Sequence, residues 1–203
     1  MPHPDTPIAL AALQLARDHL DPFLFNHVMR SHAFGREAAA LQGLVYDEEL
    51  YFVGAVLHDL GLVERFIGQD RFEIDGADAA AEFLSRQGYS DAKIAVVWDA
   101  IALHSTPGVP QRKQPEIALV QLGAGIDIGA IPRALVTPES VEMILAEYPR
   151  LGFKRAMLDA MAAVIRRKPM TGAVNLMGEV GRDHAHLPIP GFCAIVMNAE
   201  FDE

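Results

Sequence analysis

The sequence predicts an all-α protein. Helix-starting signals recur along the whole chain, and no long stretch alternates apolar and polar residues with the period of two that marks a half-buried strand. The chain has 203 residues, 51% of them hydrophobic, so it can bury a substantial core as one domain. We therefore expect a compact single-domain helical bundle over residues 1–203. Only the tail segment FCAIVMNA (192–199) could instead be a strand.

Eight helices are expected, and each begins at a residue that caps or initiates a helix. The expected starts are Thr6-Pro7, Asp21-Pro22, Asp47, Asp75, Ser90, Pro115, Thr137-Pro138 and Phe153. The second helix should end near Gly43, the third at Gly61 and the fourth at Gly88. The fifth should end before Pro107, the sixth near Gly129 and the eighth at Lys168. Loops 67–74 and 106–114 follow the helices that carry His58-Asp59 and His104, so both are expected beside a functional site.

The composition narrows the function class. A formal charge of −10 argues against general nucleic-acid binding, which needs a basic surface. The single cysteine, Cys193, fits a reducing compartment, and the first residues lack the pattern of a signal peptide. The longest apolar stretch, IALVQLGAGIDIGAI, is too short to span a bilayer. We expect a cytoplasmic protein that binds neither membrane nor nucleic acid and that can form a homo-oligomer.

The most informative motif is FVGAVLHDLGL, in which His58 and Asp59 follow an apolar run. Burying an imidazole or a carboxylate is costly unless it is paired or binds a metal. The run LYFVGAVL (50–57) is apolar nearly all round, which predicts a central buried helix with His58 and Asp59 in its last turn. The negative end of the helix dipole there favours a cation.

Two distant residues are candidate partners for this pair. His27 shares a helix face with Arg30 and Ser31, a mixture that suits a pocket wall, although His32 on the same helix is a rival. Asp127 is a lone carboxylate in the apolar, glycine-rich helix QLGAGIDIGAI, where Gly123 and Gly125 would allow close packing. Asp127 is either a metal ligand or a buried carboxylate paired with an arginine. The four residues His27, His58, Asp59 and Asp127 would provide two nitrogen and two oxygen ligands.

The order His, His-Asp, distant Asp resembles the HD superfamily of metal-dependent phosphohydrolases. Within that superfamily, NHVMRSHAFG, VLHDLGL, RFEIDGADAAAEFL and WDAIALHST are similar to the cyanamide hydratase-like branch. The resemblance covers roughly residues 20–130, the core motifs, and more weakly the FDE ending; residues 131–203 would form C-terminal helices and an irregular tail. It implies an HD-type helical bundle in which His27, His58, Asp59 and Asp127 bind one divalent transition metal (Zn, Fe, Mn or Co, with Zn or Fe favoured).

Several further polar residues are candidates for catalysis or substrate binding. Asp59 could also orient the attacking water as a base. His104 could bind substrate or shuttle a proton, and as the one histidine between His58 and Asp127 it gives little support for a second metal ion. Arg30 is either a pocket cation or a surface residue. Glu73 and Asp75 are candidates for substrate binding, with a solvated loop charge and a helix N-cap as the respective alternatives.

The expected activity is water chemistry activated by the metal on a small polar substrate, as in the hydration of a nitrile-type carbon to a urea or amide. The alternative is an HD-type phosphohydrolase acting on a nucleotide or another phosphomonoester. That reaction would need cations near the phosphoryl oxygens, for which Arg30, Arg65, Arg71, Arg112 and Lys113 are available. A third hypothesis is a catalytically silent HD-like domain that binds a ligand, which would be expected to have lost a metal ligand.

Overall fold

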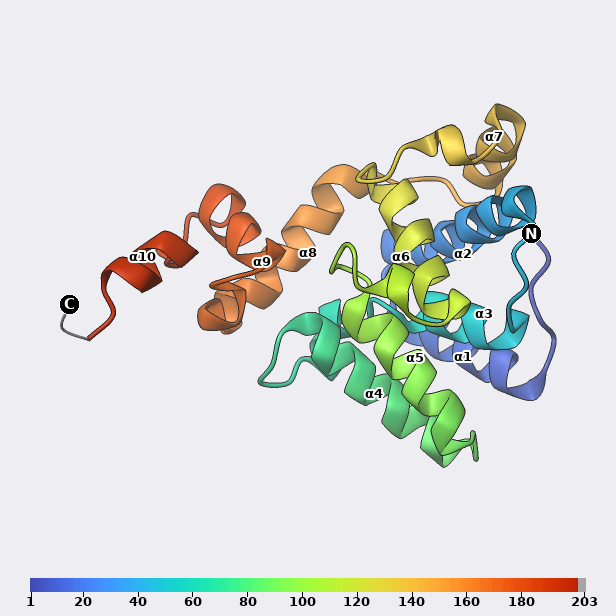
Figure 1. Cartoon of the computed structure of the whole chain (residues 1–203), viewed down its shortest axis with the longest axis horizontal. Helices are drawn as coiled ribbons and strands as arrows, with labels where there is room; N and C mark the ends of the chain where they lie inside the picture. The colour runs from blue at the N-terminus through green and yellow to red at the C-terminus, as the bar shows by residue number, and fades with distance from the viewer. Residues whose placement is uncertain (201–203) are drawn as a thin grey trace.

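Most of the helices begin at the capping residues that the sequence predicts. The computed structural model describes residues 1–200, which form ten α-helices and no strand, with 3₁₀ turns in several of the connections, so the all-α prediction is confirmed (Figure 1). The side chains of Thr6, Asp47, Ser90 and Thr137 each accept a hydrogen bond from a backbone N–H of the first turn. The helices are α1 (Pro7–His19), α2 (Pro22–Gln42), α3 (Glu48–Leu57), α4 (Phe72–Arg86), α5 (Asp91–Leu103), α6 (Pro115–Ile128), α7 (Pro138–Glu147), α8 (Phe153–Arg167), α9 (Leu176–Glu179) and α10 (Phe192–Met197).

Helix α3 is the central element, as its apolar sequence predicts. Every residue from Leu50 to Leu57 is buried, and α3 contacts α1, α2, α5 and α6. An element that is surrounded in this way needs apolar residues on all faces. The last turn of α3 therefore delivers His58 and Asp59 to the interior of the protein rather than to its surface.

Helices α2 and α6 pack closely along much of their length. Gly123 lies against the backbone carbonyl of Ser31, which a Cβ at this position would overlap. The absence of a side chain therefore sets the separation of the two helices. This close approach brings His27 on α2 next to Asp127 on α6, although the two residues are 100 positions apart in the chain.

Two helix boundaries differ from the sequence prediction. Helix α3 ends at Leu57, with His58 at its C-cap, and a separate 3₁₀ turn spans Leu60–Leu62, so Gly61 lies inside that turn instead of ending the helix. Helix α4 begins at Phe72, so Asp75 lies within its first turn and is not the N-cap. The prediction for Asp75 was wrong because the carboxylate makes contacts outside its own helix.

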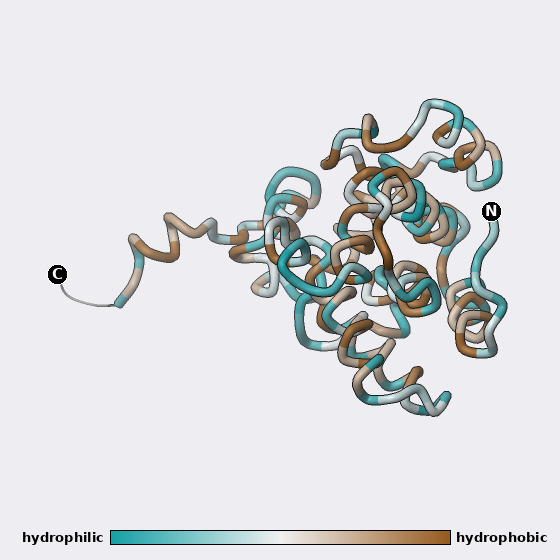
Figure 2. Tube along the Cα trace, turned by 45° about the vertical axis from the view of Figure 1, so that its right-hand side comes forward, coloured by the Kyte–Doolittle hydropathy of each residue, from teal (hydrophilic) through white to brown (hydrophobic). Residues whose placement is uncertain are grey.

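The C-terminal part forms a second, looser group around α8, which contacts α2 and the 3₁₀ turn Leu60–Leu62 beside the site. The segment that could have been a strand is helix α10, whose residues are all exposed and which projects away from the rest of the chain (Figures 1 and 2). No helix in residues 1–200 is long and apolar enough to cross a bilayer. The FDE ending, at Phe201–Glu203, lies outside the described residues.

Candidate metal centre

His27, His58 and Asp59 converge at the end of α3. Each offers one ligand atom, and the three atoms lie within 4.8 Å of one another. The Nε2 atoms of the two histidines are 3.3 Å apart, and each is 3.4 Å from Oδ2 of Asp59. All three residues are buried, with at most 3% of their surface exposed. The structure thus brings together three of the four residues expected to bind a metal.

Hydrogen bonds behind both imidazoles fix which nitrogen faces the group. Nδ1 of His58 donates to the carbonyl oxygen of Ala55 (2.7 Å), and Nδ1 of His27 donates to Oδ2 of Asp127 (2.7 Å). A neutral imidazole with its proton on Nδ1 carries a lone pair on Nε2. Both lone pairs therefore point at the same small volume, as they do in the histidine ligands of metal sites.

Among the described residues, no lysine or arginine pairs with Asp59, whose ionic contacts are all with histidines. Oδ2 of Asp59 is buried and has no hydrogen-bond partner in residues 1–200. Burial raises the pKa of Asp59, and burial together with the neighbouring His27 lowers the pKa of His58 to about 3. Two facing lone pairs beside an unpartnered carboxylate oxygen repel one another. A divalent cation resolves this repulsion, so the donor set fits such an ion.

Asp127 lies outside the converging group, on the far side of the His27 ring. Its side chain is fully buried and accepts hydrogen bonds from His27, Arg30 and Arg150. Burial alone would raise the pKa of Asp127, but the hydrogen bonds from His27 and Arg30 hold it well below its usual range. The sequence allowed Asp127 to be either a metal ligand or a buried carboxylate paired with an arginine, and the structure shows it paired with arginine.

Arg30 is neither a surface residue nor a cation that lines the cavity. It is completely buried, and its guanidinium also donates to the carbonyl oxygens of Tyr148 (3.1 Å) and Pro149 (3.3 Å). It therefore supports Asp127 instead of facing a substrate. Arg150, which no local sequence signal identifies, reaches the same carboxylate from the connection between α7 and α8.

His104, the C-cap of α5, stands on the other side of Asp59. Its Nε2 atom is 3.8 Å from Oδ1 of Asp59, and its ring centre is 4.8 Å from that of His58. Nδ1 of His104 donates to the carbonyl oxygen of Ile101 (2.6 Å), which leaves a lone pair on Nε2. Burial, followed by the neighbouring His58, lowers the pKa of His104 to about 4.

The two acidic residues expected to bind substrate have other roles in the structure. Glu73 is fully buried in α4, so it is not a solvated loop charge; it accepts hydrogen bonds from Arg71 and from Ser105. Asp75 accepts hydrogen bonds from the backbone N–H groups of Gly68 and Asp70 and from Lys168. Neither carboxylate lines the cavity described next.

A cavity of about 160 Å³ opens directly over the group. Its polar lining residues are His27, His58, Asp59, His104, Ser105 and Gln121. The remaining wall is apolar and includes Phe72, Ile128, Met157, Met161 and Leu176. Among the described residues, no lysine or arginine lines it. Gln121 was not predicted from the sequence, although a lone amide in the apolar helix α6 is a signal of the same kind as Asp127.

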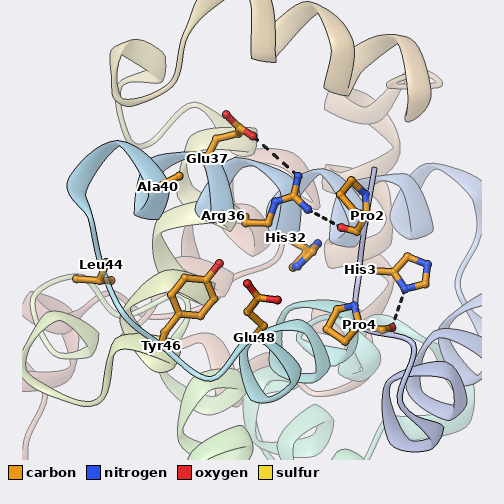
Figure 3. Close-up of a pocket in the computed structure, with 10 residues that line it drawn as sticks. All are labelled: Pro2, His3, Pro4, His32, Arg36, Glu37, Ala40, Leu44, Tyr46 and Glu48. Atoms are coloured by element: carbon orange, nitrogen blue, oxygen red, sulfur yellow. Dashed lines mark hydrogen bonds and ion pairs between the residues drawn. The ribbon is translucent and has the colours of Figure 1, made fainter.

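A larger cavity, of about 510 Å³, lies elsewhere and is lined by His32, Arg36, Tyr46, Glu48 and the N-terminal segment Pro2–Pro4 (Figure 3). His32, the rival of His27, faces this cavity and is absent from the three-residue group. Its position five residues after His27 turns it to another face of α2. Size alone does not locate the chemistry, because the converging ligand atoms are in the smaller cavity.

No protein-family model matches the chain, and no curated protein matches its sequence significantly. The inference of function therefore depends on the sequence motifs and on the geometry of the site.

Proposed function

We propose that this protein is an HD-type metal-dependent enzyme that adds water to a small uncharged substrate, such as a nitrile-type carbon. One observation supports the metal in particular: Oδ2 of Asp59, which is buried and has no hydrogen-bond partner within residues 1–200, lies 3.4 Å from the Nε2 atoms of His27 and His58. Two imidazoles and a carboxylate suit Zn²⁺ or Fe²⁺ among the transition metals. Such an ion, when bound, supplies an acidified water and an electrophilic centre.

The size of the cavity favours a small substrate. A volume of about 160 Å³ compares with the roughly 150 Å³ of an apolar cavity that holds one benzene molecule. Sites for larger ligands occupy about 300–1,000 Å³. The volume therefore favours cyanamide or a short nitrile over a nucleotide.

The charges around the cavity also favour hydration over phosphoryl transfer. Hydration of a C≡N group forms one C–O bond and adds protons to nitrogen, and no anionic group leaves. None of the five cations considered for phosphate binding lines the cavity. Arg30 is bound to Asp127, Arg71 to Glu73 and Lys113 to Asp99. A phosphohydrolase would therefore depend mainly on the metal to stabilise the charge on the phosphoryl oxygens, which favours the hydration reaction.

The residues of the chain can handle the protons of such a reaction. The lone pair on Nε2 of His104 can accept a proton from water that attacks the substrate and return it to nitrogen. The carbonyl oxygen of Gln121 accepts a hydrogen bond from Gln111 (2.6 Å), which leaves its NH₂ group free to donate to a substrate heteroatom in the cavity.

The test combines elemental analysis of the purified protein with assays on cyanamide, short nitriles and a panel of nucleoside monophosphates. We expect about one transition metal per chain and formation of urea from cyanamide. His58→Ala should lose the metal, whereas His186→Ala, at an exposed histidine outside the site, should keep it. Phosphate release would move the protein to the phosphohydrolases. Failure to bind metal even after reconstitution would refute the proposal and favour the silent ligand-binding domain.

A further inference from the structure

The carboxylate of Asp127 is saturated with hydrogen-bond donors. Oδ1 accepts from Nε of Arg30 (2.8 Å) and from Nη1 of Arg150 (2.8 Å). Oδ2 accepts from Nη2 of Arg30 (2.8 Å) and from Nδ1 of His27 (2.7 Å). An ionised carboxylate offers about four lone-pair sites, and four donors occupy them here. A metal ion could bind Asp127 only by displacing one of these donors.

Displacement would leave a buried charge without its partner. The side chains of Arg30 and Asp127 are both 0% exposed, and the guanidinium of Arg30 is fixed by two further bonds to backbone carbonyls. Arg30 cannot follow a rotating carboxylate, and a lone guanidinium in the interior is strongly destabilising. The hydrogen bonds of Arg30 to Asp127 and to the two carbonyls therefore fix the orientation of the Asp127 carboxylate.

The hydrogen bond from His27 to Asp127 fixes the tautomer and the orientation of the His27 ring. A carboxylate can only accept, so Nδ1 of His27 must carry the proton, and its Nε2 lone pair is directed at Asp59 and His58. The ring of Phe153 lies 4.8 Å from that of His27 and limits its rotation. His58 likewise directs its Nε2 lone pair at the group, because its Nδ1 donates to the carbonyl oxygen of Ala55.

We propose that Asp127 is a positioning residue for His27, clamped by Arg30 and Arg150, and that the chain provides three direct metal ligands, His27, His58 and Asp59. This inference deepens the proposed function and depends on its metal. It also assigns a role to Arg150, which links the start of α8 to the site through Asp127.

Cobalt(II) is a suitable probe, because its visible absorption spectrum reports the atoms that bind it. The variants are Asp127→Asn and Arg150→Gln, with Asp59→Asn as the example of a lost ligand and Arg167→Gln, in an exposed ion pair, as the control. We expect Asp127→Asn to weaken Co²⁺ binding about 10- to 100-fold, as losses of supporting carboxylates do, and to keep the wild-type spectrum at saturation. Asp59→Asn should change the spectrum.

A second readout needs no metal. In the metal-free wild type, ¹⁵N NMR should show the His27 ring protonated at Nδ1, and Asp127→Asn should weaken or abolish this tautomer preference. If Asp127→Asn does not fold, Arg150→Gln still tests the clamp, with an expected several-fold loss of Co²⁺ affinity and an unchanged spectrum.

The outcomes separate this inference from the proposed function. If Asp127→Asn alters the Co²⁺ spectrum as Asp59→Asn does, Asp127 is a ligand and only this inference is overturned. If Arg150→Gln binds Co²⁺ as tightly as Arg167→Gln does, the clamp is overturned. If the wild type binds no Co²⁺ at all, the proposed function and this inference fall together.

Discussion

The ammonium group of Lys168, at the C-cap of α8, donates to the buried carboxylate of Asp75 in the first turn of α4. Asp75 also accepts from the backbone N–H groups of Gly68 (2.8 Å) and Asp70 (3.1 Å). A single carboxylate therefore ties together α4, the preceding loop and α8. Because α8 supplies Met157 and Met161 to the wall of the cavity, this ion pair holds that wall in place.

Replacement of Lys168 by Met should destabilise the protein by about 2–3 kcal/mol, since the Asp75 side chain is only 5% exposed and would lose its charged partner. Urea unfolding followed by circular dichroism measures this change. Lys154→Met is the matched control, because Lys154 lies on the exposed part of the same helix. Equal stabilities of the two variants would show that the pair contributes nothing.

Gly123→Ala should be among the most damaging small substitutions in the chain. The added Cβ would overlap the carbonyl oxygen of Ser31, and a backbone atom cannot move aside as a flexible side chain can. We expect a loss of about 3 kcal/mol in the free energy of unfolding, together with weaker metal binding as His27 moves away from Asp127.

Gly191→Ala provides the comparison for Gly123→Ala. No atom would lie within 4 Å of its Cβ, and the φ of −80° at Gly191 suits any residue, so its stability should stay close to that of the wild type. A Gly123→Ala variant as stable as Gly191→Ala would mean that α2 and α6 can separate freely.

The parts of the fold that could be predicted from the sequence are those determined by neighbouring residues. The caps at Thr6, Asp47, Ser90 and Thr137 act within one helical turn, and the apolar run of α3 needs no knowledge of its partners. Asp75 shows the limit of this reasoning. Asp-Gly-Ala-Asp reads locally as a helix start, but the carboxylate instead binds Lys168, 93 residues away.

In the site, too, the contacts between neighbouring residues could be predicted from the sequence and those between distant residues could not. His58 and Asp59 are adjacent, so their joint role could be predicted from the motif. The link between His27 and Asp127 spans 100 residues and depends on the packing of α2 against α6. Arg150 could not be found because an arginine in a connection between helices has no distinctive local pattern. The fully buried position of Glu73 likewise depends on α5, whose end places Ser105 against it.

Acid should destabilise the metal-free protein. Burial is the main cause that lowers the pKa of His32 and His58 to about 3 and that of His104 to about 4 in the folded chain. Their ordinary pKa is about 6.5, so below pH 6.5 the unfolded chain binds more protons than the folded one. The free energy of unfolding should therefore be level above pH 7 and fall as the pH drops from 6.5 toward 4.

His32→Phe separates one contribution to this acid sensitivity. It removes one titrating group and keeps a planar ring between Tyr51 and Phe52. Urea unfolding in the presence of a chelator, at pH 7.5 and pH 4.5, should show a smaller acid loss for this variant, by about 2 kcal/mol. An identical loss in both proteins would mean that His32 is protonated in the folded state.

The proposed hydration of a small substrate predicts that the volume of the cavity sets the range of substrates. Met161 lies in the apolar wall shared by the cavity over the metal group and an outer groove on α8. Met161→Ala should join the two spaces and allow nitriles with longer or branched chains to bind. Met161→Trp should fill the cavity and abolish turnover of all but the smallest substrates.

Kinetics on a series of nitriles of increasing length measure this effect as a shift in the length at which kcat/KM is greatest. Metal content should stay constant in both variants, because Met161 is not one of the proposed ligands. Leu158→Ala, on the exposed side of α8 in the outer groove alone, controls for changes in the helix itself. If Met161→Ala leaves the preferred length unchanged, the substrate does not enter this cavity, and the chemistry must take place elsewhere.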